Sequence, residues 1–472
     1  MKNILLGAAA LLCATPLCAN AANADDAQAA DARPADARPA DARPADAKPE
    51  ESVSEDRLRA DIDALVGFGT RHTMSVQDHP TRGIGAARRW GENEFRKVSA
   101  ACGGCLEIAL PERMVEGRRI AVPTRLVNVV AIQRGTQRPD EVIIVQGHID
   151  SRVTDVLDAT SDAPGANDDG SGTALVVEAA RALSGRKYPA TIVYALLSGE
   201  EQGLYGGTLM ADYAQAQGWT VKAVLNNDIV GGSCGSDGYC DDSHVRVFSE
   251  GPRADATDGL RADMRRNGGE NDSPSRNLSR WIDQLADEDA SGLDVRQIWR
   301  TDRMGRGGDQ LPFLDKGFPA VRFSVAVEDY DHQHQDLRIE NGTSYGDTAA
   351  EMDFAYLAKV TRLNIRAIER LAQAPMPPAP AAEAAVQTFT TISWDEVPGA
   401  TGYSIWKRAT DNPQWEEKPV IENVVATSAN LEGVRGDDWF FGVSARSAEG
   451  AMSPIASAVP GGAFRPLPSP AD

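Results

Sequence analysis

VIIVQGHID, residues 142–150, is a run of apolar residues that ends in a glycine, a histidine and, two positions later, an aspartate. A continuous apolar run of this kind predicts a strand that is buried on both faces, as in a parallel sheet. The imidazole of His148 suits zinc, and the carboxylate of Asp150 could hold the other ring nitrogen. A lone histidine at the end of a strand is as often structural, so the neighbouring segments have to decide.

Two further apolar runs end in the same way. Residues 191–197 lead into Glu200 and Glu201, and the run at 221–228 ends in Asp228. Each of the three predicted strands therefore delivers a possible metal ligand at its carboxyl end. In open α/β sheets this is the edge where active sites lie.

Helical patterns alternate with these strands, which predicts an α/β fold with a mostly parallel central sheet and helices on both faces. The spacing of apolar residues predicts helices at 56–66, 83–99, 172–183, 204–217, 254–264, 279–288 and 356–372. Further strands are expected at 106–110, 126–132 and 318–323, and an irregular segment at 231–251.

The composition changes along the chain and divides it into six segments. We expect a signal peptide at 1–21, a disordered Ala/Asp/Arg/Pro repeat at 22–50, the α/β domain at 51–374, a Pro/Ala-rich linker at 375–385, a small all-β sandwich at 386–460 and a tail at 461–472. The sandwich is predicted because residues 389–394, 402–408 and 439–445 alternate with a period of two.

The signal peptide predicts export to the periplasm or the extracellular space. Its apolar run is too short to span a bilayer, and neither Cys13 nor Cys18 follows the small residue of a lipoprotein cleavage site, so no membrane anchor is expected. The four remaining cysteines predict two local disulfides, Cys102–Cys105 and Cys234–Cys240. A redox or zinc half-site is the alternative for the Cys102–Cys105 pair.

The chain of 472 residues carries a formal net charge of −21, so we expect no nucleic-acid partner and no anionic membrane surface. The acidity is interpreted as a means of solubility, with an acidic substrate groove as the alternative. A hydrophobic share of 42% and a charged share of 25% are ordinary for a globular protein.

One set of residues suits two divalent metals that share a carboxylate. Its members are His148, Asp168, Glu201, Asp228 and either His332 or His334, from a chain with only six histidines. Histidine and carboxylate ligands without cysteine favour zinc in a hydrolytic site, and Glu200 stands beside Glu201 as a possible base.

Each of these residues also has a structural interpretation. Glu200 and Glu201 could be an ordinary acidic first turn of a helix, and residues 167–170 (NDDG) could cap the helix that follows. Asp228 could belong to a turn after its strand. The ordered series as a whole favours the metal site.

The motifs together resemble the secreted dizinc aminopeptidase family typified by bacterial leucyl aminopeptidase. They are His148-Ile149-Asp150, residues 165–172 (GANDDGSG), residues 200–206 (EEQGLYG) and Asn227-Asp228, and the resemblance extends over residues 58–372. Phe68-Gly69-Thr70-Arg71 and residues 308–313 are also similar. Asp309 resembles a carboxylate near the site, without a firm role.

This resemblance implies two Zn²⁺ per chain. His148 and Asp228 would bind one ion, Glu201 and a late histidine the other, and Asp168 would bridge them. Glu200 would be the general base, and Asp150 would orient His148. The family commonly has a tyrosine directly before the last histidine and an Asp-Thr pair a few residues later.

Here residues 330–334 (YDHQH) offer two histidines, and the Asp-Thr pair comes only at 347–348. In an extended segment His332 and His334 would point to the same side, so spacing does not choose between them. By resemblance to relatives with a His-Gln pair we favour His334.

The family implies a secreted aminopeptidase that removes N-terminal residues from peptides or proteins with a free N-terminus. The alternatives are a carboxypeptidase or amidohydrolase, a glutaminyl cyclase on the same scaffold, or a binding module that has lost activity. Basic residues near the site, such as Arg303, Arg306 or Arg322, would favour a carboxylate-ended substrate. The C-terminal sandwich resembles a fibronectin type III module through Trp394, Tyr403 and Trp406, and its residues do not name a partner.

Overall fold

A computed structural model describes residues 48–289 and 291–468. The predicted signal peptide, the Ala/Asp/Arg/Pro repeat up to residue 47 and the last four residues of the tail lie outside the described residues. The described chain begins with a 3-10 helix, η1 (Pro49–Ser52), at the end of the predicted repeat, and Pro49 is already buried there.

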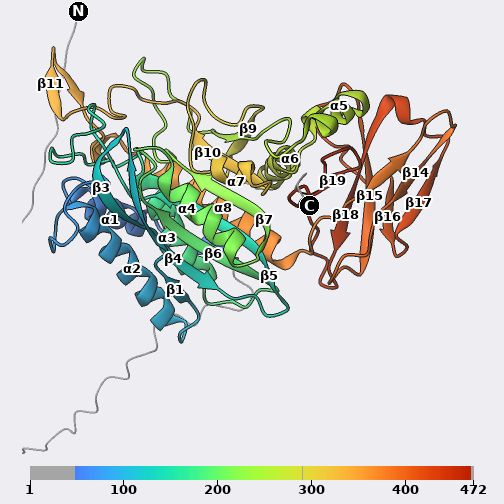
Figure 1. Ribbon diagram of the computed structural model, residues 1–472, viewed down its shortest axis with the longest axis horizontal. Helices are drawn as coiled ribbons and strands as arrows, with labels where there is room; N and C mark the ends of the chain where they lie inside the picture. Colours follow the sequence, from blue (N-terminus) through green and yellow to red (C-terminus); the bar gives the residue numbers. More distant parts are fainter. Residues whose placement is uncertain (1–47, 290, 469–472) are drawn as a thin grey trace, which may run out of the picture. The chain divides into compact units, whose positions relative to one another are not determined.

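The run at 142–150 forms most of strand β5 (Arg138–His148), which lies inside an eight-stranded sheet (Figure 1). In spatial order the strands are β1 (Glu107–Ala109), β4 (Val129–Gln133), β6 (Ala190–Leu197), β5, β7 (Thr220–Asn227), β10 (Ala320–Val325), β8 (His244–Phe248) and β9 (Asp294–Ile298). Strands β6, β5, β7 and β10 run parallel at its centre, which confirms the predicted sheet.

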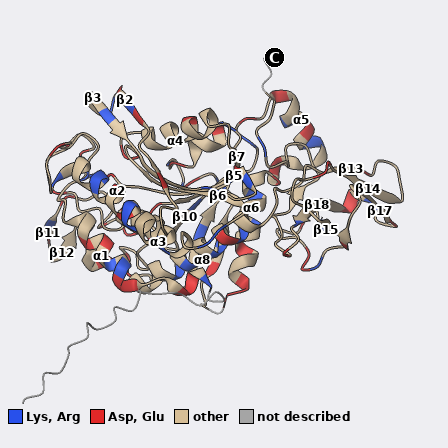
Figure 2. Cartoon of the chain, turned by 90° about the horizontal axis from the view of Figure 1, so that it is seen from below, with Lys and Arg blue, Asp and Glu red and all other residues tan. Residues whose placement is uncertain are grey.

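Helices cover both faces of this sheet, as predicted. Ile143 and Val145 of β5 pack into a core that includes α1, α2, α3, α6 and α8, whereas Val142 and Ile144 pack against α4 and α7. Figure 2 shows α4 on one side of the sheet and α1, α3 and α8 on the other, with charged residues on the helices and few on the central strands. The helices are α1 (Glu55–Val66), α2 (Gly83–Ala101), α3 (Gly170–Leu183), α4 (Tyr205–Ala216), α5 (Asp258–Asn267), α6 (Pro274–Asp287), α7 (Leu311–Asp315) and α8 (Phe354–Gln373).

Some short elements were not predicted. Strands β8 and β9 lie at one edge of the sheet, and β8 falls within the segment expected to be irregular. Two hairpins also escaped prediction, β2 (Glu112–Gly117) with β3 (Ile120–Val127) and β11 (Arg338–Glu340) with β12 (Thr343–Tyr345). Short and exposed strands carry little apolar periodicity, because their side chains face water. Three further 3-10 turns are η2 (Gly269–Asn271), η3 (Ala349–Glu351) and η4 (Gly436–Asp438).

The C-terminal region consists of two antiparallel sheets, as predicted. One has the order β13-β14-β17 and the other β16-β15-β18-β19. Side chains of both sheets, among them Ile392, Ile405, Leu431 and Val443, share one core. The strands are β13 (Ala381–Glu383), β14 (Phe389–Ser393), β15 (Gly402–Ala409), β16 (Ile421–Val424), β17 (Ser428–Glu432), β18 (Trp439–Arg446) and β19 (Ala456–Ser457).

The segment predicted to be a linker is packed, and β13 lies inside it. The ammonium of buried Lys222 donates to the carbonyl oxygens of Leu371 (3.0 Å) and Ala374 (2.6 Å), just before the linker begins. The start of the predicted tail is held as well, since the Arg253 guanidinium donates to carbonyl oxygens of residues 461, 463 and 465.

A buried charge cluster joins the C-terminal sheets to the α/β domain. Asp272, just before α6, accepts from Arg280 of α6 at 3.2 Å and from Arg408 of β15 at 2.8 Å. Ser457 of β19 donates to the same carboxylate at 3.0 Å. All four side chains are almost fully buried, so each charge depends on the others for its partner.

Both predicted disulfides are formed, Cys102–Cys105 after α2 and Cys234–Cys240 in the loop between β7 and β8. No helix in the described part of the chain is long and apolar enough to cross a bilayer.

Candidate metal centre

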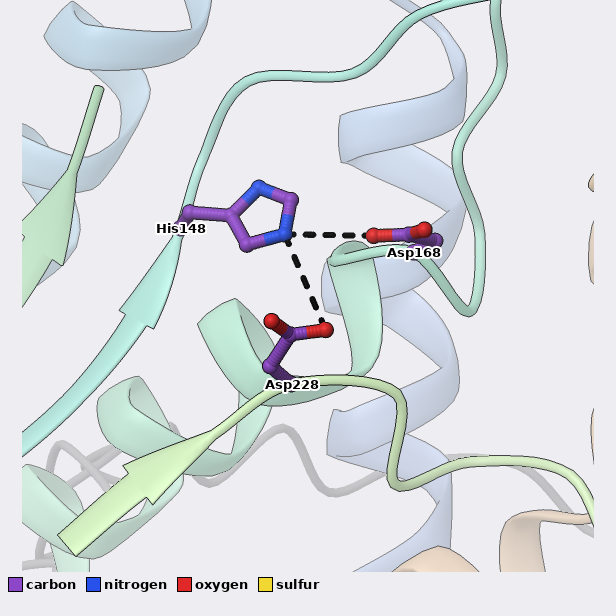
Figure 3. A group of neighbouring side chains, drawn as sticks. All are labelled: His148, Asp168 and Asp228. Atoms are coloured by element: carbon purple, nitrogen blue, oxygen red, sulfur yellow. Dashed lines mark ion pairs between the residues drawn. The ribbon is translucent and has the colours of Figure 1, made fainter. Parts of the chain in front are cut away.

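Three neighbouring parallel strands bring the predicted ligands to one edge of the sheet. His148 is the last residue of β5, Asp228 follows β7 directly, and Glu201 lies four residues beyond β6. Asp168 comes from the loop that leads into α3, and Figure 3 shows it facing the ring of His148 together with Asp228. The register of the parallel strands places these residues side by side, because adjacent strands end at the same edge.

The side chains form two groups that share Asp168. In the first, the Nε2 atom of His148 lies 3.1 Å from Asp168 Oδ1 and 3.9 Å from Asp228 Oδ1. In the second, the Nε2 atom of His334 lies 2.9 Å from Asp168 Oδ2 and 3.2 Å from Glu201 Oε1. Asp168 thus offers one carboxylate oxygen to each group, which is the geometry required of a bridging ligand.

Both groups fit zinc. Within each group the nitrogen and oxygen atoms lie within 4.8 Å of one another, and all are histidine or carboxylate atoms. The buried Oε1 atom of Glu201 accepts no hydrogen bond from any described residue, which leaves a lone pair free for a cation. The ligand atoms present therefore suit zinc, the metal expected from the sequence.

The second histidine of the pair belongs to the centre and the first does not. His332 turns away to Asp329 (2.7 Å) and Glu351 (3.5 Å). The expectation of an extended segment was wrong here, because residues 330–334 form a turn and His334 has a positive φ of 60°. A left-handed residue redirects its side chain, so two histidines two positions apart face different groups.

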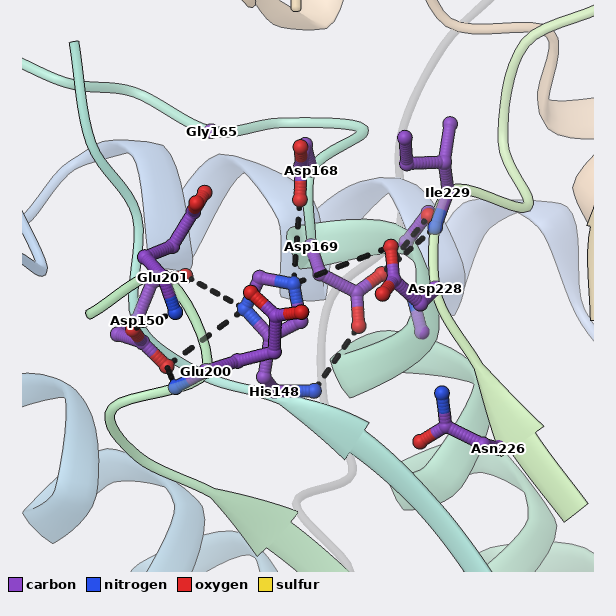
Figure 4. A network of polar contacts seen from close by, with 12 residues as sticks. His148, Asp150, Gly165, Asp168, Asp169, Glu200, Glu201, Asn226, Asp228 and Ile229 are labelled. Atoms are coloured by element: carbon purple, nitrogen blue, oxygen red, sulfur yellow. Dashed lines mark hydrogen bonds and ion pairs between the residues drawn. The ribbon is translucent and has the colours of Figure 1, made fainter. Parts of the chain in front are cut away.

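Asp150 holds both the first histidine and the segment that carries the predicted base. The Nδ1 atom of His148 lies 3.1 Å from the backbone oxygen of Asp150 and 3.6 Å from its carboxylate. The same carboxylate accepts from the backbone N–H groups of Glu200 (3.3 Å) and Glu201 (3.2 Å). Figure 4 shows these contacts around the His148 ring.

Asp169 caps helix α3, which is the structural role that the sequence offered as the alternative for residues 167–170. Its carboxylate accepts from the N–H of Gly172 in the first turn of α3 and also from that of His148, both at 2.9 Å. The two adjacent aspartates therefore have separate tasks. Asp168 faces the metal groups, and Asp169 ties the helix start to the end of β5.

Two residues that sequence analysis left without a role hold the Asp168 loop from outside. Asp347 accepts from the N–H groups of Asn167 (2.8 Å) and Asp168 (2.6 Å). The buried guanidinium of Arg71 donates to the carbonyl oxygens of Ile149 (2.7 Å) and Gly165 (2.8 Å). Their membership of the FGTR and Asp-Thr motifs was the available signal.

Burial and charge–charge contacts among the side chains shift pKa values in the centre. Burial disfavours the imidazolium of His334, but Glu201 and Asp168 outweigh it and raise its pKa to about 9. Burial and the nearby carboxylates of Asp228 and Glu201 raise the pKa of Glu200 well above its usual value, although His148 opposes this. A glutamate with a raised pKa is a stronger proton acceptor once ionised.

Arginines contact both groups, which the sequence did not predict in detail. Arg322 of β10 is fully buried and pairs with Asp228 at 2.7 Å. Arg152 donates to Glu201 Oε2 at 2.8 Å, and its guanidinium lies 2.5 Å from His334 Nδ1. Asp309 belongs to neither group. It accepts from the N–H of Gly207 in the first turn of α4, at 3.0 Å.

A cavity of about 310 Å³ opens onto the centre. Five of the predicted site residues line it, namely Asp168, Glu200, Glu201, Asp228 and His334. The predicted residues His148 and Asp150 do not line the cavity. Arg303 and Arg306 also line this cavity, whereas Arg322 lies behind Asp228.

Comparisons with known proteins identify the relatives of this chain. A model of Peptidase family M28 matches residues 128–352. A probable zinc metalloprotease of Pyricularia oryzae is 43% identical over 420 residues, which cover 86% of this chain and 82% of that protein. Another from Leptosphaeria maculans is 40% identical over 413 residues, covering 86% and 95%. The solved structure of LapB from Legionella pneumophila has a TM-score of 0.49 and 16% identity, covering 69% of this chain and 74% of that one.

Proposed function

Because this chain belongs to peptidase family M28 and is a zinc metalloprotease, we propose that it is an aminopeptidase that uses two zinc ions. The shared ligand Asp168 is the observation that carries the proposal. Its two carboxylate oxygens face two separate histidine–carboxylate groups, and Glu200 lies in the same cavity.

In this proposal His148 and Asp228 would hold one zinc, Glu201 and His334 would hold the other, and Asp168 would belong to both ligand sets. Bound zinc would supply Lewis acidity, which polarises a peptide carbonyl and acidifies water. Glu200 accepts a proton from the attacking water at its carboxylate and returns it to the leaving amine. Asp150 keeps Glu200 in position through the backbone N–H of that residue.

The size of the cavity supports an exopeptidase. A volume of about 310 Å³ lies at the lower end of the usual range for ligand pockets, about 300–1,000 Å³, which suits one or two residues rather than a long peptide.

A panel of aminoacyl anilides, run beside elemental analysis, tests the proposal. We expect two zincs per chain and hydrolysis only when the α-amine is free. One zinc with release of pyroglutamate from N-terminal glutamine would instead identify a glutaminyl cyclase. Metal without cleavage of any peptide would leave a binding protein.

A carboxypeptidase is the second candidate function. The arginines Arg303 and Arg306 in the cavity favour it, since guanidinium groups bind carboxylates. Peptides blocked at the N-terminus but free at the C-terminus discriminate the two, because only a carboxypeptidase would cleave them.

The residue roles, the export route and the C-terminal module remain part of this proposal. We infer export from the predicted signal peptide, and the two disulfides fit an oxidising compartment. The fibronectin type III resemblance of the C-terminal sheets stays a prediction. We also propose a peptide substrate from the family of the chain, and no nucleic-acid partner from its net charge of −21.

A further inference from the structure

Four arginines line the same cavity as the metal-binding carboxylates, and they come from three separate segments. Arg119 lies in the turn between β2 and β3, Arg152 follows β5, and two more lie between β9 and α7, namely Arg303 and Arg306. These guanidiniums place positive charge in the cavity beside its carboxylates, and positive charge in a concave site attracts anionic ligands.

The positive charge of this wall is only partly balanced by protein carboxylates. Glu328 is shared among three guanidiniums, those of Arg246 (2.6 Å), Arg303 (3.1 Å) and Arg306 (3.2 Å). Arg119 is exposed and donates to the backbone oxygen of Glu201 at 3.1 Å, and it has no ion pair with any residue in the described ranges. Arg306 and Arg119 therefore retain capacity for a further anion.

The carboxylates that line the cavity do not neutralise these arginines, because most of them are proposed metal ligands. Asp168, Glu201 and Asp228 belong to the two metal groups, so their negative charge would be matched by cations of the centre. Arg303, by contrast, is held by Asp302 at 3.1 Å as well as by Glu328, and it contributes charge without being free to move.

The cavity offers little to an apolar side chain. Leu204 is the one large apolar residue among the described residues that line it, and Gly203, Gly305 and Gly307 account for most of the uncharged remainder. A pocket that selects leucine or phenylalanine would need apolar walls, because its affinity comes from burying apolar surface.

We propose that Arg119 and Arg306 form a binding site for a carboxylate of the substrate, next to the bond that is cleaved. This inference rests on the proposed peptidase function of the same cavity. The carboxylate has two possible sources, the side chain of an acidic N-terminal residue or the α-carboxylate of a short peptide. A guanidinium binds either through charge-assisted hydrogen bonds.

Matched substrate pairs test the proposal and separate the sources. Glutamyl and glutaminyl anilides differ only in the side-chain charge, and Ala-Ala and Ala-Ala-amide differ only in the terminal charge. We expect kcat/KM to be about tenfold to a hundredfold higher for the charged member of one pair. Equal values within both pairs would overturn the proposal, even if the enzyme cleaves neutral anilides as an aminopeptidase.

The variants Arg306→Ala and Arg119→Ala should each lower that ratio by about tenfold. Arg306→Lys should keep part of it, since a point charge remains. Arg118→Ala is the matched control, because Arg118 adjoins Arg119 and does not line the cavity. Unchanged ratios in both alanine variants, with melting temperatures like the wild type, would contradict the assignment.

Calorimetry gives a readout that does not require turnover. The zinc-loaded protein is titrated with glutamate and with glutamine, and the glutamate affinity should fall in Arg306→Ala but not in Arg118→Ala. If no free-amine substrate is cleaved, the aminopeptidase proposal fails, and this titration still decides the carboxylate site. Equal affinity for glutamate and glutamine would exclude the side-chain carboxylate as the ligand, and a glutamate affinity that is unchanged in Arg306→Ala would reject the site.

Discussion

The carboxylate of Asp347 lies 2.6 Å from the backbone nitrogen of Asp168, although 179 residues separate them. The same carboxylate accepts from the N–H of Asn167, so it fixes the backbone of the shared ligand without touching either metal group. Asp347 thus holds the backbone at Asp168 in place through a contact between residues far apart in the sequence.

Asp347→Ala should therefore loosen Asp168. We expect a loss of about 10- to 100-fold in metal affinity or kcat/KM, as for other residues that orient ligands. Zinc content after dialysis against a chelator measures it. Asp158→Ala is the control, because Asp158 also accepts backbone N–H groups but lies in an exposed loop. Equal zinc retention in both variants would exclude the positioning role.

Glu200→Gln removes the proposed proton acceptor while preserving the shape of the side chain. We expect kcat to fall by about 10²- to 10⁴-fold, the usual contribution of a general base, with both zincs retained. Near-normal turnover in a variant with two zincs would show that another group accepts the proton.

The two late histidines should behave differently on substitution. His334 contacts Asp168 and Glu201, so His334→Ala should lose one of the two metals. His332 faces Asp329 and Glu351, so His332→Ala should keep both. Elemental analysis of the two proteins decides, and the reverse pattern would assign the ligand to His332.

Glu250 predicts a pH dependence of stability far from the metals. Burial raises the pKa of Glu250 to about 8, against 4.5 for an ordinary glutamate. The folded state then binds more protons than the unfolded state between these values, so the free energy of unfolding should fall as pH rises from 5 to 8. The slope contributed is at most about 1.4 kcal/mol per pH unit.

Glu250→Gln removes this ionisation and can still accept the hydrogen bond from Ala254. Its melting temperature should gain on the wild type as pH rises from 5 to 8. The exposed Glu417→Gln serves as control and should follow the wild type. Parallel melting curves for all three proteins would mean that Glu250 is not protonated in the folded state.

The buried cluster around Asp272 predicts that the C-terminal sheets stabilise the whole protein. Asp272→Ala would leave the buried Arg280 and Arg408 facing each other without a counter-charge. We expect a loss of about 3–5 kcal/mol in the free energy of unfolding, measured by denaturant titration. Glu92→Ala breaks the largely exposed Arg96 pair and should cost about 1 kcal/mol or less. A similar small loss for Asp272→Ala would refute the coupling.

The sequence alone determined the elements whose pattern is local. The apolar runs of β5, β6 and β7 predicted buried parallel strands. A predicted ligand stands at or just after the end of each strand, and the sheet brings these ligands together. The helices other than the five-residue α7 were found because their apolar residues recur at helical spacing. Strands β8 and β9 were missed because each has only five residues, too few to repeat a pattern clearly.

Only the tertiary structure decided contacts between residues far apart in the chain. It separated His334 from His332 because a left-handed turn, which no spacing reveals, directs their side chains to different groups. It also brought Asp347 to the Asp168 loop, gathered Arg119 and Arg306 at one cavity, and buried Asp272 between two arginines. Local propensity acts over a few residues, whereas these relationships depend on which surfaces pack together after the chain has folded.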